Sequence, residues 1–162
     1  MNKLKYFLTE YLDISSPYML QEERTKKENQ WEIACEKYSE YIKDNENIFS
    51  KSFLKIYKNG GFHDYKIDSI NFKFEEDKNR LDIVVNLESS KKTFSFICKD
   101  VRNFFSSFEY EKDSITPNYY LYGEYYKDEN KLWHHNFLFG DLYEINITSK
   151  DFIFKIGDVS EP

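Results

Sequence analysis

Residues 70–98, INFKFEEDKNRLDIVVNLESSKKTFSFIC, decide the fold, because apolar side chains recur there at every second position. The alternation runs over 70–74, 81–87 and 94–98, with the polar stretches EEDKN and ESSKK between. Alternation of this kind is typical of β-strands that bury one face. Three such segments about ten residues apart, joined by short turns, predict an antiparallel meander.

Further strand candidates follow towards the carboxyl end. Turns are expected at Gly140-Asp141 and at Thr148–Lys150, where Gly, Asp, Ser and Thr favour chain reversal. Residues 101–110, VRNFFSSFEY, are ambiguous between a strand and a helical turn. The four additional strand candidates are 119–126, 131–139, 142–147 and 152–156.

The segment before the strands has a helical period. Between Tyr18 and Lys43 the apolar residues fall three and four positions apart, which predicts one amphipathic helix. A second, shorter helix is expected from Ile48 to Tyr57. Asn59-Gly60-Gly61 should end it, because glycine tolerates the left-handed conformation at a helix C-terminus.

Helices followed by strands, with no room for βαβ crossovers, indicate an α+β fold. We expect the N-terminal helices to pack on one face of an antiparallel meander sheet. The 162 residues fit one domain, 1–162, with a helical part over 1–60 and a sheet part over 61–157. Aromatic residues make up 19% of the chain, which argues against disorder although 32% of the residues are charged.

The net charge of −6 is unevenly distributed. Residues 1–62 hold 10 basic and 10 acidic residues, so residues 63–162 carry the whole excess. An acidic surface repels phosphate groups, so we expect neither nucleic acid nor an anionic membrane as a partner. A basic protein partner is compatible with this charge. The first sixteen residues lack the apolar stretch of a signal peptide, which predicts a cytoplasmic protein. Cys35 and Cys98, each with apolar neighbours, are expected to be reduced core residues.

Short catalytic motifs are missing from the sequence, which lacks a phosphate-binding glycine loop, GxSxG, HExxH and CxxC. His63-Asp64, between the second helix and the first strand, is a candidate acid–base pair or a structural turn. Trp133-His134-His135 places two histidines on opposite faces of a strand, which disfavours a shared metal. We therefore expect no cofactor, no metal site and no catalytic residue that the sequence can name.

The most unusual stretch is NYYLYGEYY, residues 118–126. Tyrosine is common at protein interfaces, since it combines a large ring with a hydroxyl group. A binding surface or homodimer edge is one interpretation, and rings that fill a core are the other. The binding candidates from the sequence are His63, Asp64, Tyr119, Tyr122, Glu124, Tyr125, Trp133 and His134.

Five segments of the chain form a further pattern: Leu4–Phe7, Phe62-His63-Asp64, Leu81–Val85, Tyr119–Glu124 and Gly140–Ile145. Together they resemble a family of small uncharacterised bacterial proteins, a domain of unknown function. That family has an N-terminal helical part, an LHD-type turn, a WLYEE-like strand and a closing hydrophobic-acidic strand. The present chain departs from it, with Phe62 in the leucine position and Tyr119-Tyr120 in place of a tryptophan. The resemblance implies no catalytic residue.

Three functions follow as hypotheses. The leading one is a non-enzymatic, cytoplasmic protein-binding protein, similar in size and charge to the immunity proteins that inhibit bacterial toxins. The second is a small enzyme or ligand binder with a sheet-lined pocket around His63 and His134, to which Asp64 and Glu124 contribute. The third is a homodimer held through the tyrosine-rich strand.

Overall fold

The computed structural model describes residues 5–6, 19–63, 65–89, 91–107, 119–140 and 143–158, without the side chain of Leu121. The chain divides into two compact units, Met1–Ile48 and Phe49–Pro162. The boundary falls between the two expected helices, so the second helix belongs to the same unit as the sheet.

The first unit contains helix α1 (Gln21–Asp44) and the 3-10 helix η2 (Glu46–Ile48). Along α1, Ala34, Tyr38 and Ile42 recur every four residues and are buried, as the apolar spacing predicted. Glu22 and Glu23 lie in its first turn and Lys43 in its last, so their charges complement the helix dipole.

The second unit begins with helix α2 (Lys51–Lys58). It starts three residues later than expected because the Ser50 hydroxyl accepts a 3.2 Å hydrogen bond from the Phe53 N–H and caps the helix. Gly60 and Gly61 have φ of 100° and 69°, and the Gly61 N–H donates to the Ile56 carbonyl at 3.0 Å. The expected glycine end of this helix is thus confirmed.

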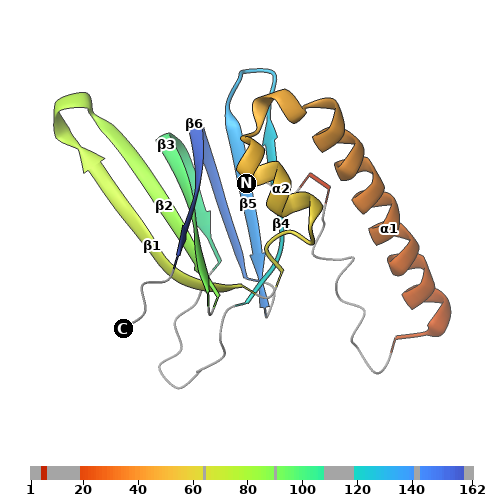
Figure 1. Ribbon diagram of the computed structural model, residues 1–162. Coiled ribbons are helices and arrows are strands. Elements are labelled where there is room, and N and C mark those ends of the chain that lie inside the picture. The colour runs from red at the N-terminus through yellow and green to blue at the C-terminus, as the bar shows by residue number, and fades with distance from the viewer. Residues whose placement is uncertain are drawn as a thin grey trace. The chain divides into compact units, whose positions relative to one another are not determined.

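Six antiparallel strands form one sheet in the order β1-β2-β3-β6-β5-β4 (Figure 1). Each half of the sheet is a three-stranded meander, and β3 pairs with β6 where the halves join. Helices followed by an antiparallel sheet confirm the α+β class. The strands are β1 (Lys66–Glu75), β2 (Arg80–Glu88), β3 (Lys92–Ser106), β4 (Tyr120–Lys127), β5 (Trp133–Phe139) and β6 (Glu144–Asp158).

The two longest strands resolve one open alternative and correct one expectation. The ambiguous residues 101–106 continue strand β3, and the expected turn at Thr148–Lys150 lies within strand β6. The physical reason is a bulge. Asp100 has φ of 53°, and the register with β6 shifts between Val101 and Asn103. A bulge bends a strand without ending its ladder, so both strands continue for 15 residues.

The two edge strands meet at one end of the sheet. Lys66 of β1 forms an isolated antiparallel bridge with Tyr119, and the Tyr120 N–H donates to the Tyr65 carbonyl at 2.7 Å. At the other end, β1 and β2 spread away from β4 and β5 (Figure 1). The sheet therefore resembles a barrel that is closed at one end and open at the other.

Aromatic rings fill the concave face of this sheet. Phe96 stacks on Tyr125 at 5.3 Å between ring centroids and meets Phe137 edge-on at 5.2 Å, so rings from β3, β4 and β5 share one core. Phe53 brings α2 onto the same cluster, 5.1 Å from Tyr125 and 5.5 Å from Phe154. Edge-to-face pairs of this kind add to the stabilisation from burial.

Candidate binding surface

Strand β1 is one of the two edge strands of the sheet, and much of its surface is exposed. It pairs with β2 along its length, and in the described part of the chain its other side pairs only at Lys66. No residue of β1 is buried, and the four residues from Asn71 to Phe74 are all exposed. The backbone N–H and C=O groups on the outer side of such a strand are available to another strand.

Two phenylalanines project from this edge. The side chains of Phe72 and Phe74 are 56% and 58% exposed, and both lie on the face of the sheet that carries Ile83. The Phe72 ring contacts the Phe104 ring edge-on at 5.1 Å between centroids. Large apolar side chains that remain exposed side by side are typical of protein-binding surfaces.

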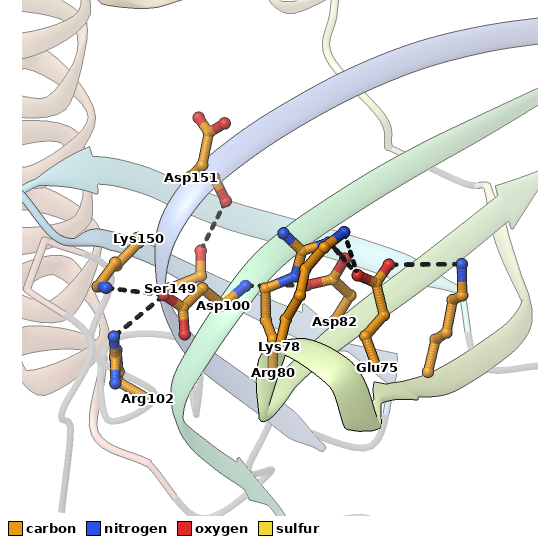
Figure 2. Close-up of polar contacts among 10 residues, drawn as sticks. Glu75, Lys78, Arg80, Asp82, Asp100, Arg102, Ser149, Lys150 and Asp151 are labelled. Atoms are coloured by element: carbon orange, nitrogen blue, oxygen red, sulfur yellow. Dashed lines mark hydrogen bonds and ion pairs between the residues drawn. The ribbon is translucent and has the colours of Figure 1, made fainter.

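An ion-pair network holds the β1–β2 hairpin. Glu75 lies 2.9 Å from Arg80 Nη2, 2.9 Å from Lys78 Nζ and 3.6 Å from Lys73 Nζ. The hydrogen bond from Lys78, with the positive charges of Arg80 and Lys73, lowers the pKa of Glu75 to about 2. Figure 2 shows Arg80 between the carboxylates of Glu75 and Asp82. Glu75 therefore stays ionised at any physiological pH.

The same network reaches the bulge in β3. The Asp82 side chain, 8% exposed, accepts a 3.1 Å hydrogen bond from Arg80 Nη2 and a 3.0 Å hydrogen bond from the Asp100 N–H. Asp100 in turn lies 2.8 Å from Lys150 Nζ and 3.0 Å from Arg102 Nη2, and these contacts lower its pKa (Figure 2). The cations thus pair with carboxylates of the same unit, and they fix the hairpin that carries the exposed edge.

The tyrosine-rich strand is mostly interior. Tyr120, Tyr125 and Tyr126 are 3%, 1% and 9% exposed, and the Tyr120 and Tyr125 hydroxyls lie 3.0 Å apart. Burial raises the pKa of Tyr120. Of the predicted tyrosines only Tyr119, which is 37% exposed, and the half-buried Tyr122 retain accessible surface. Rings that fill the core therefore account for most of this stretch.

The other predicted residues are scattered. His63 is exposed and its ring lies 5.7 Å from the Tyr122 ring, while Asp64 lies outside the described residues. Trp133 is buried edge-on against Phe49 at 5.4 Å. Glu124 is fully buried and accepts a 3.2 Å hydrogen bond from the Asn136 amide.

His134 is the second residue of β5, directly after the turn from β4. Its Nε2 lies 3.0 Å from Asp128 Oδ2, its Nδ1 lies 3.4 Å from the Thr148 hydroxyl, and its ring stacks on Tyr126. Burial opposes ionisation of Asp128, but hydrogen bonds with His134 and the Leu132 N–H outweigh it and lower the pKa. The contacts fit a turn that is fixed by its side chains.

His63 and His134 do not meet in one site. His63 contacts Tyr122, whereas His134 is paired with Tyr126, four residues further along β4. That separation corresponds to about 13 Å along a strand. Within the described ranges, no three His, Cys, Asp or Glu side chains gather closely enough to hold a metal ion. Among the described helices, none is long and apolar enough to cross a membrane.

Two features were missed in the sequence. The first is the exposure of β1, since its alternating Ile70, Phe72 and Phe74 gave the same signal as the buried strands. The second is the buried His135, whose Nε2 lies 3.1 Å from the Ser149 hydroxyl. Burial, with the nearby His134, lowers the pKa of His135 to about 3. A sequence pattern gives no signal for either, because both depend on which strands become neighbours.

Comparisons with known proteins assign this chain to no family. No protein-family model matches the chain, and no curated protein has a similar sequence. The functional argument therefore rests on the surface itself.

Proposed function

We propose that this chain is a non-enzymatic protein-binding protein that presents the β1 edge to its partner, in the manner of an immunity protein that holds a toxin. The exposure of Phe72 and Phe74, 56% and 58%, carries the proposal, together with the outer side of β1, which pairs only at Lys66 among the described residues. Keeping two large apolar side chains in water costs free energy that a partner would recover on binding.

The edge suits an extended segment of another protein. Strand addition supplies main-chain hydrogen bonds, while alternate side chains give specificity. On one face the partner would meet Ile70, Phe72 and Phe74, and on the other Asn71, Lys73 and Glu75. The ion pairs of Glu75 and Arg80 support a preformed edge, so little order has to be gained on binding.

Charge supports a basic partner. Residues 63–162 hold the whole net charge of −6, and this range includes β1. Complementary charge mainly accelerates association, so binding should weaken as salt is raised.

The test is co-expression with proteins encoded by neighbouring genes, followed by pull-down at low and moderate salt. The double variant Phe72→Ser, Phe74→Ser should retain at least about tenfold less partner than the wild type, because it removes the buried centre of the contact. Phe105→Ser is the matched control, since Phe105 is also exposed, at 40%, but lies on β3. Retention of no protein by the wild type, together with no protection in a toxicity assay, would refute the proposal.

A small enzyme or ligand binder is the second candidate, and the Thr148, His134 and Asp128 contacts favour it. Such a chain of hydroxyl, imidazole and carboxylate resembles a hydrolytic arrangement. Thr148, however, is only 5% exposed. Hydrolysis of an activated ester that His134→Gln abolishes and His63→Gln preserves would support this candidate. Equal rates for the wild type and both variants would count against it.

A further inference from the structure

Within the part of the chain that the structure describes, seven regular residues of β1 have no strand partner on their outer side. The register with β2 shifts between Ile67 and Ser69, and the strand ends at Glu75. Between these limits, from Ser69 to Glu75, the pairing with β2 proceeds without a break. The centre of the segment is Phe72.

A second copy of this chain can pair with the segment about a two-fold axis. Because such an axis keeps each face of the sheet on one side, residues of one face must oppose residues of the same face. With Phe72 on the axis, it opposes Phe72 of the second copy, and each Ile70 opposes a Phe74. All seven residues are then paired, and the six apolar side chains form one continuous cluster.

The residues on the other face of the sheet are also compatible with this register. Each Asn71 opposes a Lys73, and each Ser69 opposes a Glu75. No two like charges lie directly opposite each other, a situation that would destabilise the pair.

The two neighbouring registers are worse. With Asn71 on the axis, each exposed Phe74 opposes Asp68, the residue at which the register with β2 shifts. With Lys73 on the axis, the two Lys73 ammonium groups oppose each other. Self-complementarity therefore favours one register over the alternatives on both sides.

We infer that the chain forms a homodimer in which β1 pairs antiparallel with β1 of a second copy, centred on Phe72. The inference rests on the proposed function in one respect, that β1 is the protein-binding edge. The second copy and another partner protein would use the same side of β1, so each excludes the other there. The dimer extends the six-stranded sheet into a twelve-stranded one across the axis.

Single cysteines at neighbouring positions test the register. Phe72→Cys, Asn71→Cys and Lys73→Cys are each made in a Cys35→Ser background, because Cys98 is buried. Opposed residues of an antiparallel pair have Cα atoms about 4.5–5.5 Å apart, which a disulfide spans. In the inferred register the two copies of residue 71, like those of residue 73, are offset by about 7 Å along the strand, beyond that reach.

Under mild oxidation, Phe72→Cys should therefore form a covalent dimer, while the other two variants stay monomeric. Cross-linking at residue 71 or 73 instead would overturn the register. Equal cross-linking at all three positions, or at none, would overturn the paired edge.

Sedimentation velocity over a range of concentrations tests the dimer without a cross-link. Phe72→Glu places two carboxylates on the axis and should halve the mass at concentrations where the wild type is dimeric. Phe105→Glu, at another exposed site (40%) away from β1, should leave the mass unchanged. A wild type that is monomeric throughout refutes the dimer.

The two proposals fail separately. A monomeric wild type that still retains a partner protein in the pull-down refutes the dimer and leaves the proposed function standing. A wild type that forms the dimer in the inferred register but retains no other protein supports the dimer and refutes the proposed function.

Discussion

Strands β5 and β1 belong to the same sheet but have opposite environments. Six of the seven residues of β5 are buried, whereas none of the ten residues of β1 is. Yet β5 contains two histidines and an asparagine, while β1 carries alternating Ile and Phe. The difference follows from position, since β5 lies between β6 and β4 and β1 lies at the edge. Apolar character alone therefore does not place a strand inside.

The comparison also separates two roles for aromatic rings. Phe96 is fully buried among rings from three strands, whereas Phe72 has one ring neighbour in the described part of the chain and is 56% exposed. The first type of ring stabilises the fold. The second type is the one we assign to binding.

The largest expected effect contrasts these two rings. Phe96→Ala should lower the free energy of unfolding by about 3–5 kcal/mol, because it removes a fully buried ring and leaves a cavity. Phe72→Ala should lower it by less than about 1 kcal/mol. Urea denaturation of both variants at low protein concentration measures the difference. Similar losses for the two variants would mean that Phe72 belongs to the core.

A smaller effect is expected at the centre of the tyrosine-rich strand. A Cβ at Gly123 would collide with the Tyr120 hydroxyl and would lie 2.8 Å from the Tyr125 hydroxyl. Gly123→Ala should therefore destabilise the fold by about 1–3 kcal/mol through overpacking. Gly140→Ala is the control, because the nearest atom to its Cβ would be 3.9 Å away. Thermal denaturation that shifts equally for both would argue against a packed tyrosine pair.

The third prediction uses the buried histidine of β5. The pKa of His135 falls from its ordinary value of 6.5 to about 3 in the folded chain, because burial disfavours the charged imidazole. Between these values the unfolded chain binds a proton that the folded chain does not. The free energy of unfolding should therefore fall as the pH falls from 6.5 towards 3, by about 1.4 kcal/mol per pH unit.

Denaturation at a series of pH values separates this contribution from those of other groups. His135→Gln should reduce the dependence of the free energy of unfolding on pH by the contribution of one proton. An unchanged slope in His135→Gln would show that His135 titrates normally in the folded chain.

Local features of this protein follow from local sequence. The four-residue recurrence of Ala34, Tyr38 and Ile42 was enough to predict α1, and two glycines marked the end of α2. Alternation located the strands, because a side-chain period of two or 3.6 is a property of neighbouring residues. The bulge at Asp100 was not predicted, since no sequence pattern distinguishes one bent strand from two strands joined by a turn.

The sequence by itself determined the α+β class, the helices and most strand positions. Only the tertiary structure decided that Tyr125 lies inside and Phe72 outside, and that His63 and His134 stay apart. The reason is that burial depends on the strand order β1-β2-β3-β6-β5-β4, which joins residues distant in the chain. Tyr125 meets Phe96 only because β3 pairs with β6. Phe72 remains exposed because β1 is an edge strand, whose outer side pairs only at Lys66 among the described residues.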